Sequence, residues 1–189
     1  MAEITKNEKT KYLLAQSMKE CLKSTPVDNI TVKQITEHAG ITRQTFYRNF
    51  LDKFDLINWY FEKILHKSFE HMGMGETVYD SLVKKFNYIL EERNFFAAAF
   101  RYDEQNSLRE HDFVLIMDFY QNLIKEKTGK APDKNIVYLL EMYCRSSIYM
   151  TVRWVLGEIT CSPKELASIL VDAMPAKLTE LFSELHILA

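Results

Sequence analysis

Residues 30–50 read ITVKQITEHAGITRQTFYRNF, and this stretch decides the fold. Thr31 is followed three residues later by Gln34, the spacing of a capping box, in which two side chains satisfy free amide groups at the start of a helix. Gly40 ends that helix, because glycine readily adopts the left-handed conformation of a tight turn. Thr42 can then cap another helix. The stretch therefore predicts a helix, a turn through glycine and a second helix.

The second helix of this pair, expected over residues 43–50, has a core face and a polar face. Phe46 and Phe50 are four residues apart, so both side chains point toward the core. The polar face consists of Arg43, Gln44, Thr45, Tyr47 and Arg48. Arginine and glutamine read base edges in the major groove, and hydroxyl groups suit phosphates. The spacing alone leaves two interpretations open: a DNA-reading helix, or the solvated face of an ordinary three-helix bundle.

The flanking residues complete a small N-terminal domain. Residues 7–24 carry apolar side chains at helical spacing, and Pro26 ends this helix because the residue before a proline is pushed out of the α region. Asp52 can cap the helix that follows. We therefore expect an all-α protein, with a three-helix helix-turn-helix domain over residues 1–52. A larger helical domain for ligand binding and dimerisation is expected over residues 53–189.

Three segments of the N-terminal domain resemble the DNA-binding signature of the TetR family of transcriptional regulators. They are residues 30–35 (ITVKQI), residues 39–47 (AGITRQTFY), and Phe50 with the following Asp52-Lys53. The resemblance implies that Tyr47 and Lys53 contact phosphates and that residues 42–45 face the bases. The DNA-binding residues are accordingly expected to be Thr31, Thr42, Arg43, Gln44, Thr45, Tyr47, Arg48 and Lys53.

Two positions depart from the family pattern, and two runs point to a subgroup. Ser17 stands where a small alanine is usual, and Phe54 where an acidic residue is common. Residues 43–47 (RQTFY) and 59–62 (WYFE) are similar to regulators of dihydroxyacetone-kinase operons. Members of the family are mostly repressors released by a small ligand, and some of this subgroup are activators with a protein co-regulator. The resemblance therefore leaves the sign of regulation open.

The C-terminal part is expected to be helical throughout. The spacing of apolar residues predicts helices over residues 53–71, 76–92, 94–101, 105–127, 133–158 and 162–188. Pro175 should kink or divide the last of these. The resemblance implies that the last two helices pair with their copies in a homodimer, which would bind a palindromic double-stranded DNA operator. It also implies control by a small-molecule effector or a protein co-regulator.

Aromatic and methionine side chains are concentrated in the middle helices, where the family places its ligand pocket. The candidate pocket residues are Phe96, Phe100, Phe113, Met117, Tyr120, Met142, Arg145 and Tyr149. Arg145 would orient an anionic or hydroxylated ligand. Core packing explains the aromatic side chains equally well, and filled cores also occur in this family.

The composition argues against several other classes. The net charge is −2, but residues 1–55 contain nine Lys and Arg against seven Asp and Glu, a small excess that suits a DNA reader. The three cysteines are far apart and form neither a disulfide framework nor a metal motif. No phosphate loop or catalytic motif is present, so we expect no enzyme, no catalytic residues, no cofactor and no metal.

The expected location is the cytoplasm, without a membrane partner. The N-terminus is charged and unlike a signal peptide, and no apolar run approaches the roughly 18–20 residues of a membrane span. The main alternative function is a helical protein-interaction module or co-regulator that does not bind DNA.

Overall fold

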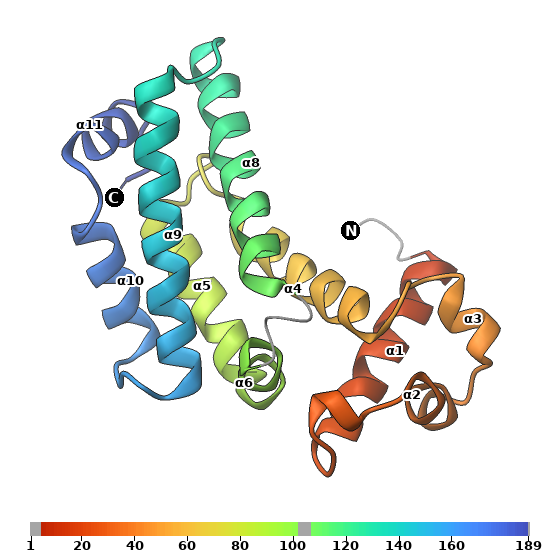
Figure 1. Cartoon of the computed structure of the whole chain (residues 1–189). Helices are drawn as coiled ribbons and strands as arrows, with labels where there is room; N and C mark the ends of the chain where they lie inside the picture. The colour runs from red at the N-terminus through yellow and green to blue at the C-terminus, as the bar shows by residue number, and fades with distance from the viewer. Residues whose placement is uncertain (1–4, 102–106, 189) are drawn as a thin grey trace. The chain divides into compact units, whose positions relative to one another are not determined.

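The computed structural model describes residues 5–101 and 107–188, which form two compact units (Figure 1). The first unit comprises the described residues of Met1–Lys63 and Asn94–Leu108, and the second comprises those of Ile64–Arg93 and Arg109–Ala189. The described residues contain helices and no β-strand, only an isolated bridge. The predicted all-α class is therefore confirmed, whereas the functional boundary after residue 52 stays a prediction.

The first unit is built around α1. It contains α1 (Lys6–Leu22), the 3₁₀ turn η1 (Val27–Asn29), α2 (Val32–Ala39), α3 (Arg43–Tyr47), the start of α4 (Lys53–Phe69) and most of α6 (Arg93–Arg101). Its core includes the fully buried side chains of Leu14, Met18, Ile35, Phe46 and Phe61. The Ser17 hydroxyl donates a hydrogen bond of 2.6 Å to the Ile35 carbonyl, which ties α1 to α2. This bond gives serine a structural role at a position where the family usually has alanine.

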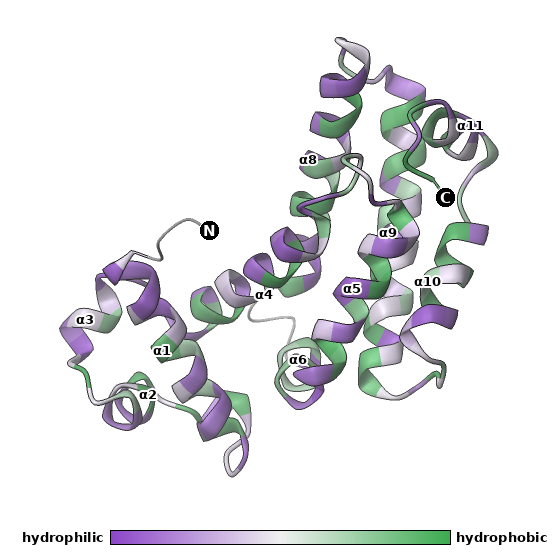
Figure 2. Ribbon diagram, turned by 180° about the vertical axis from the view of Figure 1, so that it is seen from behind, coloured by the Kyte–Doolittle hydropathy of each residue, from purple (hydrophilic) through white to green (hydrophobic). Residues whose placement is uncertain are grey.

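The second unit is a bundle of longer helices. It contains the end of α4, α5 (Val78–Glu91), α8 (Leu108–Thr128), α9 (Lys134–Leu156), α10 (Pro163–Asp172) and α11 (Ala176–Glu184). The rings of Phe86 on α5 and Trp154 on α9 are 5.5 Å apart, and the indole N–H of Trp154 donates to the Cys161 carbonyl. In Figures 1 and 2, α9 and α10 lie side by side along the bundle.

Most helix ends lie within two residues of the predicted ones. Pro175 divides the last predicted helix into α10 and α11, as expected. The third helix ends at Tyr47 rather than Phe50, because the side-chain amide of Asn49 donates to the Thr45 carbonyl at 2.7 Å and turns the chain. The start of α8 was predicted at Gln105, which lies outside the described residues.

Candidate nucleic-acid interface

A left-handed glycine joins α2 to α3. Gly40 has φ +66°, and a Cβ atom at this position would meet no heavy atom within 4 Å. The requirement for glycine therefore comes from the backbone angle rather than from lack of space. The amide of Ile41 donates to the Thr36 carbonyl at 3.0 Å and closes the end of α2. The predicted turn is confirmed, and it fixes the direction in which α3 leaves.

Two threonine side chains fix where α2 and α3 begin. The Thr31 hydroxyl accepts from the Gln34 amide at 3.2 Å, and the Gln34 side chain accepts from the Thr31 amide at 2.8 Å, which completes the predicted capping box. The Thr42 hydroxyl accepts from the Thr45 amide at 3.2 Å. Both threonines are thus helix caps, and their contact with DNA stays a prediction.

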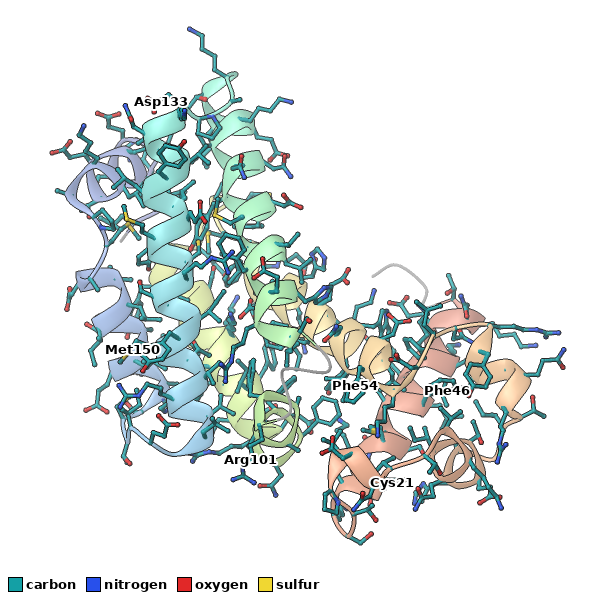
Figure 3. The ribbon with its side chains drawn as sticks, viewed as in Figure 1. Cys21, Phe46, Phe54, Arg101, Asp133 and Met150 are labelled. Carbon is teal, nitrogen blue, oxygen red and sulfur yellow. The ribbon has the colours of Figure 1, made fainter. Side chains whose placement is uncertain are left out.

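Helix α3 separates a buried ring from an outward polar surface. Phe46, labelled in Figure 3, is fully buried, and its ring lies edge-on to that of Tyr47 at 5.5 Å. Tyr47 itself is 58% exposed, so much of its side chain is open to solvent. The other exposed side chains of this surface are Arg43, Gln44 and Arg48, and Thr45 is half-buried. The structure therefore gathers the predicted base-reading side chains on one exposed helix.

Lys53 has a structural task that the sequence did not reveal. Its ammonium donates to the carbonyls of Val27 and Asp28 at 2.7 Å each and to that of Ile30 at 3.0 Å. Burial lowers the pKa of Lys53, against the opposing effect of the nearby Asp28 and Asp52 carboxylates. The three N–H donors therefore hold the segment that leads into α2. Contact of Lys53 with phosphate stays a prediction.

Asp52 caps the helix that carries Lys53. Its carboxylate accepts from the amides of Phe54 at 2.8 Å and Asp55 at 2.9 Å, as the sequence predicted. The Asp55 carboxylate in turn accepts from the Leu51 amide at 2.9 Å. This reciprocal pattern fixes the start of α4 directly after α3.

The predicted ligand-pocket residues lie in several different environments. Phe96 and Phe100 are buried in the first unit, with ring centres 5.6 and 6.1 Å from that of Phe61. In the second unit, Met117 and Tyr120 are buried, Phe113 is half-buried, and Met142 and Tyr149 are exposed.

Arg145 lies on the surface of α9. Its guanidinium donates to the Glu110 carboxylate at 2.8 and 3.2 Å and lies 3.6 Å from the centre of the Phe113 ring. The structure thus does not bring the eight predicted side chains around one cavity. Their role in ligand binding stays a prediction.

The interior of the second unit contains a buried ion pair beside a very small cavity. Lys85 on α5 is 3.2 Å from both carboxylate oxygens of Asp112 on α8, and both side chains are at least 97% inaccessible. The cavity has a volume of about 20 Å³. Its lining includes Lys85, Tyr120, Tyr143, Cys144 and Thr151.

Burial favours the neutral forms of the thiol and hydroxyl groups around this cavity. Burial raises the pKa of the Cys144 thiol to about 12, with a further increase from Asp112. It also raises the pKa values of the Tyr120 and Tyr143 hydroxyls. For Asp112, burial raises the carboxyl pKa more than Lys85 lowers it. A cavity of this size holds about one water molecule.

Two features typical of other protein classes are absent from the described residues. Within residues 5–101 and 107–188, His, Cys, Asp and Glu side chains form no group of three that could hold a metal ion. No described helix combines the length and apolar character needed to cross a membrane.

The chain is similar to several known regulators. Residues 76–175 match the TetR-type family model described as the transcriptional regulator C-terminal region. The HTH-type dhaKLM operon transcriptional activator DhaS of Lactococcus lactis subsp. lactis (strain IL1403) is 26% identical over 110 residues, which are 56% of this chain and 55% of that protein. The aligned part thus spans about half the length of that curated relative.

Solved structures share the fold over most of the chain. The dihydroxyacetone kinase operon activator DhaS matches with a TM-score of 0.66 and 19% identity over 90% of this chain and 97% of that one. NalD, the secondary repressor of the MexAB-OprM multidrug efflux pump in Pseudomonas aeruginosa, matches with a TM-score of 0.55 and 16% identity over 90% and 96%. At these identities the likeness establishes the arrangement of helices.

Proposed function

The chain belongs to the TetR family of transcriptional regulators, and from this premise we propose that it binds an operator in double-stranded DNA through α3. The observation that carries the proposal is the exposed surface of Arg43, Gln44, Tyr47 and Arg48, presented directly after the Gly40 turn. Arginine and glutamine can each form paired hydrogen bonds with a purine edge. Known members of the family are transcriptional regulators rather than enzymes, which fits a role in binding rather than catalysis.

The experiment that tests this proposal is selection of operators from random duplex DNA by the purified protein, at two salt concentrations. A palindromic motif is expected, because a symmetric dimer presents two copies of α3 to half-sites about one helical turn, or a multiple of it, apart. Binding should weaken steeply with salt, because phosphate contacts release counterions. Recovery of no motif, together with binding that is insensitive to salt, would favour a protein-interaction module without DNA binding.

Substitutions on α3 should separate base reading from phosphate contact. Arg43→Ala or Gln44→Ala is expected to lower the ratio of operator to random-DNA affinity by about 5- to 100-fold. Tyr47→Phe is expected to weaken both affinities by a similar factor, because a phosphate contact carries no sequence information. Lys177→Ala, which removes an exposed charge from α11, serves as the control. An unchanged ratio in both base-reading variants, measured by fluorescence anisotropy, would mean that α3 does not read the bases.

We also propose that the protein acts as a homodimer through α9 and α10. Tyr138, Met142 and Tyr149 are 51%, 60% and 61% exposed, and their spacing of four and seven residues places them along one face of α9. Ile169 on the neighbouring α10 is 48% exposed (Figures 1 and 2). An exposed stripe of this kind, apolar except for Arg145 between Met142 and Tyr149, is typical of an association surface.

Charges placed in this stripe should separate the subunits. Met142→Glu combined with Tyr149→Glu is expected to convert a dimer into a monomer. A symmetric interface would bury both new carboxylates from each of the two subunits. Light scattering measures the mass, and Leu90→Glu provides a control at an exposed apolar position on α5. If the doubly substituted protein still had twice the mass of one chain, the dimer contact would lie on another surface.

We propose that the C-terminal domain switches DNA binding by changing the distance between the two DNA-binding domains of the dimer, a rigid-body transition. A small-molecule effector and a protein co-regulator are the two candidate signals. The interior cavity of about 20 Å³ has room for only one water-sized group. A small effector at this site would therefore require the core around Lys85 and Asp112 to open, whereas a protein co-regulator acting on the surface would not.

A further inference from the structure

An open groove with an apolar floor lies between the end of α4 and α8, entirely within the second unit. Its volume is about 550 Å³. Phe69 on α4 and Phe119 on α8 meet in the floor, with ring centres 5.1 Å apart. Leu115 and Leu123 continue the floor along α8 on either side of Phe119. These three α8 residues are spaced by four, so they form one apolar row along the helix.

An acidic row runs beside this apolar row. Asp118 and Glu126 line the groove from α8, and Glu70 lines it from just beyond α4. All three side chains are exposed, and none has an ion-pair partner among residues 5–101 and 107–188. Asp118 and Glu126 are eight residues apart, which places them on the same side of α8 about two turns apart. The rim therefore offers three carboxylates, against the one ammonium of Lys127, around an apolar floor.

The far end of the groove is formed by the loop after α4. The Lys127 ammonium donates to the Gly73 carbonyl at 2.8 Å and fastens this loop to the end of α8. Met74, in the same loop, lines the groove and is 73% exposed. Methionine side chains adapt to irregular apolar surfaces and are frequent in grooves that accept partner helices. From Leu115 to Lys127 the groove follows α8 for about 18 Å.

We propose that this groove binds a basic amphipathic helix of a partner protein. The apolar face of that helix would lie on Phe69, Leu115 and Phe119, and its Lys or Arg side chains would face Asp118, Glu126 and Glu70. The spacing of the apolar row by four residues, and of Asp118 and Glu126 by eight, matches the repeat of a helix laid along α8. The groove is long and open, whereas small-molecule sites enclose most of their ligand. This inference is independent of DNA binding by α3.

The test uses the full-length protein and a fluorescently labelled synthetic helix of about four turns, with Leu on one face and Lys on both flanks. A matched peptide carries Glu in place of each Lys. We expect the basic peptide to bind, and the acidic peptide to bind at least about tenfold more weakly, because like charges would face each other across the rim. Fluorescence anisotropy at low and physiological salt measures both affinities.

A charge-reversed protein makes the test specific to the groove. Asp118→Lys with Glu126→Lys should weaken the basic peptide at least about tenfold and strengthen the acidic one. Asp172→Lys with Glu180→Lys changes the same net charge on α10 and α11, at exposed positions beyond the groove lining, and should preserve the original preference. Circular dichroism confirms that both variants are folded.

Three outcomes would overturn the proposal. The first is equal binding of the basic peptide to the native and the charge-reversed groove. The second is displacement of the peptide by a single-chain alkylammonium compound at a comparable concentration, which would make the site one for small cationic amphiphiles. The third is self-association of the unliganded protein that Asp118→Lys with Glu126→Lys abolishes, which would make a second copy of this chain the occupant.

Discussion

Replacing Lys85 by Met alone is expected to lower the free energy of unfolding by about 3–5 kcal/mol, because it leaves the Asp112 carboxylate buried without its cation. Replacing both residues, by Lys85→Met and Asp112→Leu, should recover most of this loss. Both side chains lie in the core, so well-packed apolar groups can replace the pair without any cost of removing charges from water. The two variants therefore separate the destabilisation caused by an unpaired buried charge from the net contribution of the ion pair to stability.

Urea unfolding followed by circular dichroism measures these changes. Lys84→Met is the matched control, because Lys84 directly precedes Lys85 on α5 and its ion pair with Glu76 is partly solvent-exposed. The free energy of unfolding of Lys84→Met should fall by no more than about 1 kcal/mol. A double variant as unstable as Lys85→Met would show that the loss comes from packing rather than from the unpaired charge.

The pH dependence of Lys85→Met gives a second check on the same interpretation. Burial already raises the pKa of Asp112 in the native protein, and removing Lys85 should raise it further. A carboxyl group with a raised pKa in the folded state becomes protonated at a higher pH than the same group in the unfolded chain. The variant should therefore regain stability as the pH falls through the folded-state pKa toward the unfolded value of about 3.9.

Replacing Lys53 by Met is expected to destabilise the first unit by about 2–3 kcal/mol, because hydrogen bonds from a charged donor are among the stronger ones in proteins. The carbonyls of Val27, Asp28 and Ile30 would lose this donor, and the segment leading into α2 would loosen. Hydrogen exchange should report faster exchange in residues 27–40. Lys23→Met is a suitable control, because Lys23 lies in the same unit and pairs only at the surface with Glu20.

Salt dependence decides whether Lys53 also contacts DNA. If its role is to position α2, Lys53→Met should weaken binding while the slope of log affinity against log salt concentration stays unchanged. A direct phosphate contact would instead lower the magnitude of that slope by about 1. The slope, measured for the intact protein and for Lys53→Met and Lys23→Met, therefore distinguishes the two roles of one ammonium group.

Local features of the fold could be predicted, because the interactions that set them lie within a few residues. The caps at Thr31, Thr42 and Asp52 each join positions two or three residues apart, and the Gly40 turn needs only a backbone angle. The end of α3 differs from the prediction for a related reason, since the side chain of Asn49 competes for a backbone carbonyl in a way that apolar spacing does not reveal.

Contacts between distant segments could not be predicted in this way. Lys53 reaches carbonyls 23 to 26 residues earlier, and Lys85 meets Asp112 27 residues later. A signal for the second contact was present, because Lys85 shares one helical face with Leu82, Phe86 and Ile89, all of which are buried. A lysine on an apolar face indicates a buried partner, but the partner's identity depends on how the helices pack.

The aromatic residues show a further limit of prediction from the sequence. Their abundance in the middle of the sequence indicated a pocket, yet it could not show which helix face each one occupies. Phe96 is in the core of the first unit, whereas Tyr149 is exposed on α9. Aromatic side chains serve cores, pockets and association surfaces alike, so only the packing of the helices separates these roles.

The burial of Cys144 has a consequence for oxidative chemistry. With a pKa raised to about 12, this sulfur stays protonated throughout the physiological pH range while the domain is folded. Peroxides and disulfides react with the thiolate, so the Cys144 sulfur is insulated from these oxidants. Cys21 and Cys161 are only partly covered, and thiol oxidation in the folded protein would begin at these two positions.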